Sequence, residues 1–176
     1  MPSSLIIGTD TYVSLVDCDV YLAAHYPSTD AKLTVWTALS DGDCDIYLRQ
    51  AAEVIDAEPI QGLKVLSTQV MQFPRILYTE TNSLFPVNNF LMYGEGWYVQ
   101  PGVPDAVKYA QCELALELAQ GTSSQAAQRA ELQRQGVRSY SIGKLSETFS
   151  GVAGDIVSYK ARQYLAPFTG GGYRIS

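Results

Sequence analysis

The chain has 176 residues, of which 18 are Asp or Glu and 12 are Lys or Arg, so its formal net charge is −6 at pH 7. A hydrophobic content of 47% with 17% charged residues is typical of an ordered globular chain and excludes an extended disordered one. The acidic balance disfavours a primary nucleic-acid binder, because such a surface gains nothing from counterion release.

The charge is unevenly distributed along the chain. Residues 1–102 hold 12 acidic and 4 basic residues, a net −8, whereas residues 103–176 hold 6 and 8, a net +2. Opposite charge at the two ends suits head-to-tail or layered contacts between subunits. We expect no membrane span and no signal peptide, and the three unpaired cysteines indicate a reducing compartment without disulfides.

Three helices are predicted before residue 60. Ser14 is a good N-cap for the first, which Pro27 ends. Residues 31–39 predict a short helical turn, and Ser40 caps a third helix over residues 41–57 whose first turn is acidic. The side chains expected to face the core are Leu15, Cys18, Leu22, Leu33, Trp36, Cys44, Leu48, Ala51 and Ile55.

No sustained helical period continues between residues 60 and 103, where aromatic residues, Pro and Gly are frequent. Residues 91–93 and 97–99 flank a Gly-Glu-Gly turn and fit a short hairpin. A loop of this length is usually functional or packed on a partner. Two alternatives stay open: the aromatic side chains fold back on the core, or Trp97 and Tyr98 contact a neighbouring subunit.

Residues 104–120 predict the central helix of the domain. Pro104 suits its first turn, Asp105 lies at the positive end of the helix dipole, and Gly121 closes it. The buried stripe is expected to comprise Val103, Val107, Ala110, Leu114 and Leu118. The charged side chains expected to lie off this stripe are Lys108, Glu113 and Glu117.

Two elements after the central helix lack an obvious partner within one subunit. Residues 124–135 favour a helix that is polar nearly all round, as helices bridging separate bodies are. Residues 137–149 read as a hairpin turning at Gly143-Lys144. Its register pairs Ile142 with Leu145, and an isolated hairpin is marginal in water. The residues predicted to contact a neighbouring subunit through it are Tyr140, Ile142, Leu145 and Phe149.

The C-terminal part follows a glycine-rich joint at residues 151–154. Asp155 is expected to cap a last helix that runs to Ala166 and ends at Pro167. Three glycines then precede an aromatic and aliphatic tip, which predicts an arm that becomes ordered on a partner. A merely disordered terminus is the alternative.

No catalytic, cofactor or metal site is predicted. The single histidine, His25, has no identifiable nucleophile to assist, and no nucleophile elbow, dinucleotide or Walker A motif occurs. The three cysteines, Cys18, Cys44 and Cys112, fall on apolar stripes. The acidic residues 41–45 resemble the start of a calcium loop but lack its later Gly and distal Glu, so helix-start charge explains them better. We therefore expect no enzyme.

A family resemblance rests on six sequence blocks taken in order. They are TYVSLVDCDVYLAAHY, WTALSDGDCDIYLRQAAEVIDAEPIQGLKV, QFPR, VPDAVKYAQCELALELAQG, GVRSYSIGKLSETFSG and LAPF. This set resembles the head–tail connector proteins of tailed bacteriophages, the head-completion adaptors below the portal, some of which are labelled DnaT-like single-stranded DNA-binding. Residues 77–100 depart from the pattern, being longer and more aromatic than expected.

The resemblance implies a mainly α fold. It implies a helical-bundle adaptor. With the elements predicted above, we expect an adaptor domain over residues 1–150, which includes a long aromatic-rich loop at 76–103 and a hairpin at 137–149, followed by a C-terminal helix and extended arm over residues 151–176. It also implies a structural virion protein at the head–tail interface, assembled in the host cytoplasm into a ring, usually twelve-fold. No cofactor or membrane is implied.

The partners implied are the portal protein, further copies of the chain, a downstream neck or tail-completion protein, and DNA that passes through the ring without specific binding. The residues predicted to bind the portal are Tyr164, Phe168, Tyr173 and Ile175. Two other functions stay open: a single-stranded DNA-binding replication accessory protein, as the label states, and a small regulatory or enzymatic cytosolic protein.

Overall fold

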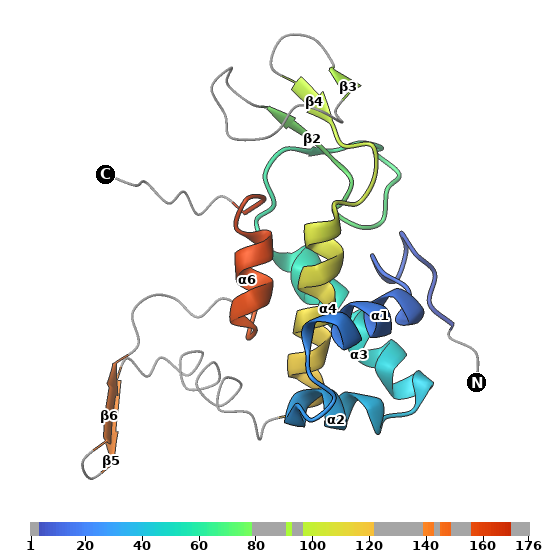
Figure 1. Ribbon diagram of the computed structural model, residues 1–176. Helices are drawn as coiled ribbons and strands as arrows, with labels where there is room; N and C mark the ends of the chain where they lie inside the picture. The colour runs from blue at the N-terminus through green and yellow to red at the C-terminus, as the bar shows by residue number, and fades with distance from the viewer. Residues whose placement is uncertain are drawn as a thin grey trace.

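The computed structural model describes residues 4–78, 91–92, 97–121, 139–142, 145–148 and 156–169, and the structural statements below concern these residues. Within them the fold is mainly α, as predicted, with a helical body and two small antiparallel sheets (Figure 1). The five helices of this part are α1 (Leu15–His25), α2 (Ala31–Thr37), α3 (Asp41–Ala57), α4 (Asp105–Ala119) and α6 (Tyr159–Leu165). None of these helices is long and apolar enough to traverse a bilayer.

The predicted starts of the first three helices are confirmed by side-chain caps. The hydroxyl of Ser14 accepts the amide of Asp17 at 3.1 Å, and that of Ser40 accepts the amide of Asp43 at 3.2 Å. Each hydroxyl satisfies an amide that has no carbonyl partner in the first turn. Asp30 caps α2 in the same way. These local signals fix the helix boundaries of the N-terminal half.

Two predicted helix starts are wrong. Pro104 is the extended N-cap residue of α4, not a member of its first turn. The last helix begins at Tyr159, four residues after Asp155, because the Ser158 hydroxyl accepts the amide of Ala161 and so caps the chain there. Asp155 itself lies outside the described residues, as do residues 124–135.

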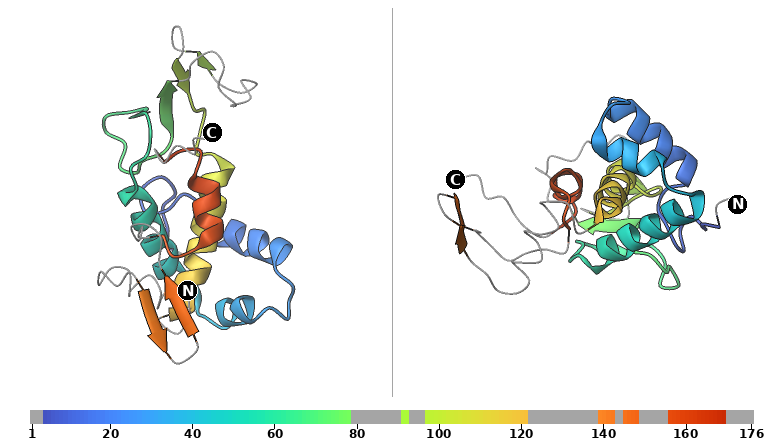
Figure 2. Two further views of the ribbon diagram at one scale, coloured as in Figure 1. Left: turned by 90° about the vertical axis from the view of Figure 1, so that its left-hand side faces the viewer. Right: turned by 90° about the horizontal axis from the view of Figure 1, so that it is seen from below.

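Helix α4 is the centre of the helical body, as predicted, with α3 and α6 packed on it and α1 and α2 covering further faces (Figures 1 and 2). In the predicted stripe, Val107, Ala110 and Leu114 are buried and Val103 and Leu118 are partly buried. Glu113 and Glu117 lie off this stripe, but they are buried as well, with only 3% and 6% of their surfaces exposed. Neighbouring helices cover the faces that a surface helix would present to water.

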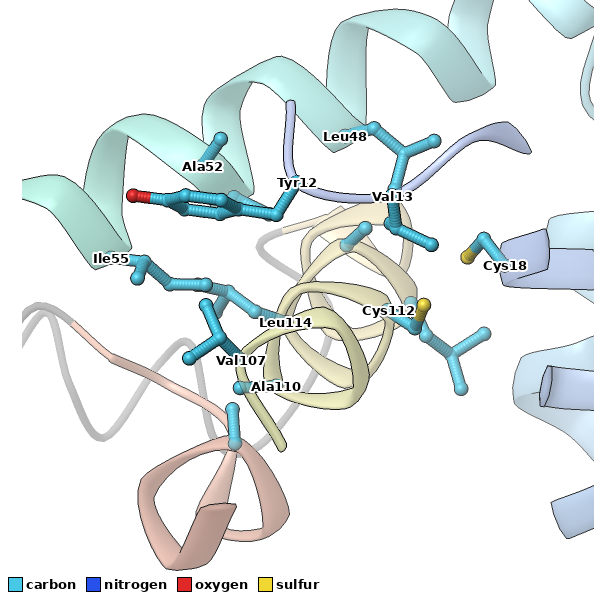
Figure 3. Close-up of a cluster of buried hydrophobic side chains, with 14 of the residues drawn as sticks. Tyr12, Val13, Cys18, Leu48, Ala52, Ile55, Val107, Ala110, Cys112 and Leu114 are labelled. Carbon is cyan, nitrogen blue, oxygen red and sulfur yellow. The ribbon is translucent and has the colours of Figure 1, made fainter. Parts of the chain in front are cut away.

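An extended N-terminal segment lies between α3 and α4 (Figure 3). Its residues Tyr12 and Val13 are buried among side chains of both helices, including Leu48 and Leu114. The side-chain amide of Gln111 on α4 holds this segment, since its oxygen accepts the Tyr12 amide at 2.9 Å and its nitrogen donates to the Leu48 carbonyl at 2.7 Å. One buried glutamine therefore ties three parts of the core together.

The described part of the stretch between α3 and α4 holds a four-stranded antiparallel sheet, where the sequence predicts a long loop at 76–103 with one hairpin; residues 79–90 and 93–96 lie outside the described residues. Its strands are β1 (Leu63–Lys64), β2 (Arg75–Tyr78), β3 (Leu91–Met92) and β4 (Trp97–Val99), in the order β1-β2-β4-β3. The predicted hairpin is confirmed, because β3 pairs with β4. The two additional strands were missed because two to four residues are too few to show a period.

Arg75 organises the base of this sheet. Its buried guanidinium donates to the carbonyls of Ile60 and Gly62, at 2.8 and 2.5 Å, and to the side-chain oxygen of Gln72 at 2.7 Å. Burial lowers the pKa of Arg75 below its ordinary value. The guanidinium thus replaces backbone pairing where the chain turns from α3 into the sheet.

The second sheet is the ribbon of β5 (Ser139–Ile142) and β6 (Leu145–Thr148). Its register pairs Ile142 with Leu145 and Tyr140 with Glu147, as predicted. Figure 1 and the right-hand view of Figure 2 draw this ribbon apart from the helical body. Helix α6 lies against α4 and contributes Ala161 and Leu165 to the main core cluster.

We predict that Gly62→Ala destabilises the protein strongly. Gly62 has φ +82°, and a Cβ there would meet the Ile76 carbonyl oxygen at 2.2 Å. We expect a loss of about 3 kcal/mol in the free energy of unfolding, measured by urea denaturation. Gly8→Ala is the matched control, since Gly8 has φ +86° but open space around it. It should cost only about 1 kcal/mol, and equal losses in both variants would contradict the clash.

Candidate functional site

The face where α6 meets α1 and α4 carries a cluster of tyrosines around one buried carboxylate. Glu113 of α4 accepts the hydroxyl of Tyr21 at 2.9 Å and that of Tyr26 at 2.5 Å. Lys160 of α6 lies 3.4 Å from the same carboxylate. The carboxylate therefore joins α1, its C-cap residue, α4 and α6 in one polar network.

This network compensates the cost of burying Glu113. A buried carboxylate without donors is strongly unfavourable, whereas two hydroxyls and an ammonium group satisfy this one. The pKa of Tyr21 is raised above its ordinary value, mainly by burial and then by the hydrogen bonds to Tyr164 and Glu113. Burial and the Glu113 hydrogen bond raise the pKa of Tyr26 likewise. Both phenols stay protonated at neutral pH and remain hydrogen-bond donors.

Aromatic rings extend the cluster to the surface. The Tyr21 ring stacks on His25 with a centroid distance of 4.1 Å and on Tyr109 at 4.7 Å. Tyr164 of α6 meets Tyr109 edge-on at 5.8 Å. Nδ1 of His25 lies 2.8 Å from the Tyr21 carbonyl, so it is the protonated nitrogen. His25 is thus held as a packed ring and contacts no nucleophile among the described residues.

A pocket of about 380 Å³ opens beside this aromatic stack. Its charged lining residues are Asp17, Asp105 and Lys108, and Lys108 is paired with Asp105 at 2.8 Å. The pocket therefore has two carboxylates and one ammonium group, and the ammonium group is already paired. This net negative charge makes the pocket unfavourable for phosphate. The full set of lining residues is Ile7, Tyr12, Val13, Asp17, Tyr21, Asp105, Lys108, Tyr109 and Cys112.

The predicted portal-binding residues do not share one environment in the structure. Tyr164 is partly buried in the tyrosine cluster. Phe168 belongs to the main core, with its ring 5.3 Å from that of Phe73, and its carbonyl accepts the amide of Gln61. Tyr173 and Ile175 lie outside the described residues. The part of the arm that remains available for a partner therefore begins after Thr169, which pairs with Ile60.

The predicted intersubunit residues lie on the two small sheets. Trp97 and Tyr98 are in β4, and Tyr98 is half-buried. Tyr140, Ile142 and Leu145 are in the β5–β6 ribbon, whereas Phe149 lies outside the described residues.

The described basic side chains all have partners of their own. These are Lys32, Arg49, Lys64, Arg75, Lys108, Lys160 and Arg162. Four form ion pairs, with Glu117, Asp10, Asp105 and Glu113. The other three donate to backbone carbonyls: Lys64 to Val70 at 2.9 Å, Arg75 to Ile60 and Arg162 to Ile156, both at 2.8 Å.

The residues considered for chemistry have structural roles. All three cysteines are buried, as predicted, and burial raises the pKa of the Cys44 thiol to about 11. A hydrogen bond to Cys112, together with burial, raises the pKa of Cys18. Among the described residues no group of acidic, histidine or cysteine side chains fits a metal ion. Residues 41–45 form the first turn of α3, where Asp43 is bonded to Ser40, as the helix-start interpretation predicted.

Sequence reasoning missed Glu113 as the centre of this face. A signal was present, since Glu113 and Glu117 are four residues apart on a helix whose flanking positions are small or apolar. Such a pair on an otherwise buried helix requires donors from neighbouring elements. Those donors, Tyr21, Tyr26 and Lys32, come from distant parts of the chain.

We predict that Glu113→Gln loosens α6. The amide retains one acceptor for the tyrosine hydroxyls but leaves Lys160 without its counter-charge, so we expect a loss of about 2 kcal/mol in the free energy of unfolding. Amide hydrogen exchange in α6 should accelerate more than exchange in α3. The control is Glu53→Gln on the exposed face of α3. Equal exchange changes in α3 and α6 would contradict the role of Glu113 in holding α6.

The chain matches the model of the family described as "Putative DnaT-like ssDNA binding protein" over residues 4–176. No curated protein and no solved structure shows significant similarity to the chain. Because the match covers nearly the whole chain, the chain belongs to the DnaT-like ssDNA-binding family.

Proposed function

We propose that the protein is a structural adaptor that assembles into a ring at the portal of a tailed bacteriophage and joins the DNA-filled head to the neck or tail. The ordered sequence blocks shared with head–tail connectors support this proposal. In this role the chain performs no catalysis and needs no cofactor. Its partners are the portal protein, further copies of itself and a downstream neck or tail-completion protein.

The observation that carries the proposal is that acidic side chains outnumber basic ones on the described part of the protein and that most of the lysines there are paired with them. Where side chains are described, 13 Asp and Glu residues stand against 7 Lys and Arg residues, a net −6, and four of the seven cations are neutralised in ion pairs. A binding surface for nucleic acid presents cations that are free to contact phosphates. A net negative wall instead repels phosphates, which suits a channel through which DNA slides.

The position of the arm is consistent with this role. The chain is anchored up to Thr169 by Phe168 in the core and by the pairing with Ile60. The residues beyond it, three glycines followed by Tyr173 and Ile175, then start from a fixed point on the subunit. Such an arm can add a strand to a partner or fill pockets on it.

The second candidate is single-stranded DNA binding, which the description of the matching family favours. The cations available for it are the five outside the described residues, namely Arg129, Arg134, Arg138, Lys144 and Arg174. The part of the chain whose side chains are not described also contains five acidic residues. DNA bound to these five cations would therefore meet a region without net positive charge.

We predict that removal of residues 170–176 abolishes assembly on the portal but leaves the subunit folded. The cut spares Phe168, so the thermal unfolding of the truncated chain should match that of the full chain. Negative-stain imaging of the protein mixed with the portal protein from the same genome should show an added ring only for the full chain.

Phe168→Ala is the matched control for this truncation. Because Phe168 packs on Phe73 in the core, this variant should lose about 3 kcal/mol of stability. Ring assembly by the truncated chain would reject the proposed role of the arm, whereas a portal that gains no ring with the full chain would reject the adaptor.

We predict that the protein does not bind single-stranded oligonucleotides tightly. In gel-shift titrations at low salt, an adaptor should give at most weak binding. A DNA-binding protein should give a dissociation constant that rises steeply with salt. The control replaces Arg129, Arg134 and Arg138 by Gln. Tight, salt-dependent binding that this triple variant abolishes would favour the second candidate over the adaptor.

A further inference from the structure

Two apolar patches of the described surface are covered by no other part of the described chain. The first patch consists of Val16 and Val20 on α1, which are 71% and 66% exposed. These residues are four apart and so share one side of the helix, with the exposed Ala23 and Ala24 continuing the stripe. An apolar stripe on a short helix is typical of a helix that packs on another protein element.

The second patch consists of Leu63, Leu66 and Val70, between α3 and β2, which are 60–64% exposed. Single exposed aliphatic residues are normal, but three within eight residues of chain form a local apolar surface. Lys64 lies among them and is held by the carbonyls of Gln69 and Val70.

The two patches face in different directions. In both views of Figure 2, α1 and the segment between α3 and β2 lie on opposite sides of α4. Two different surfaces on opposite sides cannot meet within one subunit or across a two-fold axis. They can meet between successive copies, which is the geometry of a head-to-tail contact.

The charges around the patches are complementary. Residues 14–26 contain Asp17 and Asp19 and no Lys or Arg, and both aspartates are exposed beside the first patch. The cation within the second patch is Lys64, since Arg75 is buried. Lys64 donates to backbone carbonyls and forms no ion pair with a described carboxylate, although Asp56 interacts with it electrostatically. Two carboxylates therefore face one ammonium group when the two patches are brought together.

We propose that the first patch of one copy packs on the second patch of the next copy, so that Val16 and Val20 contact Leu63, Leu66 and Val70, with Asp17 and Asp19 near Lys64. The occupant of each patch is thus a second copy of this chain. The proposal names the interface of the ring that the adaptor function requires, and in that sense it rests on that function. A repeated contact of this kind closes into a ring when its rotation allows.

The test is disulfide cross-linking between engineered cysteines on the two patches. Val20→Cys and Val70→Cys are introduced separately and together, and the purified full-length chains are oxidised. The wild-type chain is the background control, since its three cysteines are buried. An equimolar mixture of the two single variants should give dimers that grow no further, about tenfold more than either variant alone. The double variant should give a ladder of higher oligomers.

Other patterns overturn the proposal. Dimers formed by Val20→Cys alone would indicate a two-fold contact between equivalent α1 helices. Absence of cross-links above the wild-type background in the mixture and in the double variant would show that the patches do not meet. Each outcome is read on non-reducing gels and is confirmed by reversal with a thiol reductant.

A charge exchange provides a second test with its own control. Lys64→Glu and Asp17→Lys should each weaken the cross-linking of the Val20→Cys and Val70→Cys mixture about tenfold, because like charges then face each other. Placing Lys64→Glu on the Val70→Cys chain and Asp17→Lys on the Val20→Cys chain should restore it. Failure of the exchange to restore cross-linking would contradict the charge pairing.

The outcomes separate this interface from the adaptor function itself. A portal that gains a ring of this protein without any cross-link between the patches would leave the adaptor standing and reject the interface. A cross-linked ladder with no binding to the portal would support the interface and reject the adaptor function.

Discussion

The burial of residues 110–117 of α4 on all sides is the constraint on which the rest of the structure depends. A helix with one apolar stripe needs one partner, whereas α3, α6, α1 and α2 all contact α4. Its polar side chains must then find partners inside the protein. Gln111 binds the N-terminal segment, Glu113 binds tyrosines and Lys160, and Glu117 binds Lys32. Gln111 and Glu113 each bind more than one neighbouring element and Glu117 binds α2, so the polar groups of α4 fix where its neighbours pack along it.

The same constraint accounts for how α6 is held. This helix has only seven residues, too few to be stable without tertiary contacts. Ala161 and Leu165 supply its apolar contacts, and Lys160 and Tyr164 reach the network around Glu113 and Tyr21. The chain is therefore held to the helical body as far as Thr169, which pairs with Ile60. In the proposed adaptor, an arm that starts from this fixed point would meet a partner at lower entropic cost than one that starts from a flexible point.

Much of the helical body is readable from the sequence, because its signals are local. Ser14 and Ser40 mark helix starts through hydrogen bonds within three residues, and the Cys44–Ile55 stripe shows the period of α3. Of the four-stranded sheet, the β3–β4 hairpin was predicted, but β1 and β2 were not, since they are short and Arg75 replaces part of the pairing with side-chain bonds to carbonyls. The cluster around Glu113 was equally hidden, because Tyr21 and Lys160 are brought to it only by the fold.

The charge distribution connects the fold with the proposed role. Ion pairs occupy Lys32, Arg49, Lys108 and Lys160 within the helical body, so the net negative charge of that body is not offset at its surface by free cations. Lys64 is different, because among the described residues its ammonium group donates to backbone carbonyls and forms no ion pair. In the proposed ring, an acidic surface that repels phosphate would be compatible with attraction between copies, since that attraction places Lys64 opposite Asp17 and Asp19 and needs no basic face. On this proposal, the repulsion of DNA and the association of subunits would follow from one arrangement of charges.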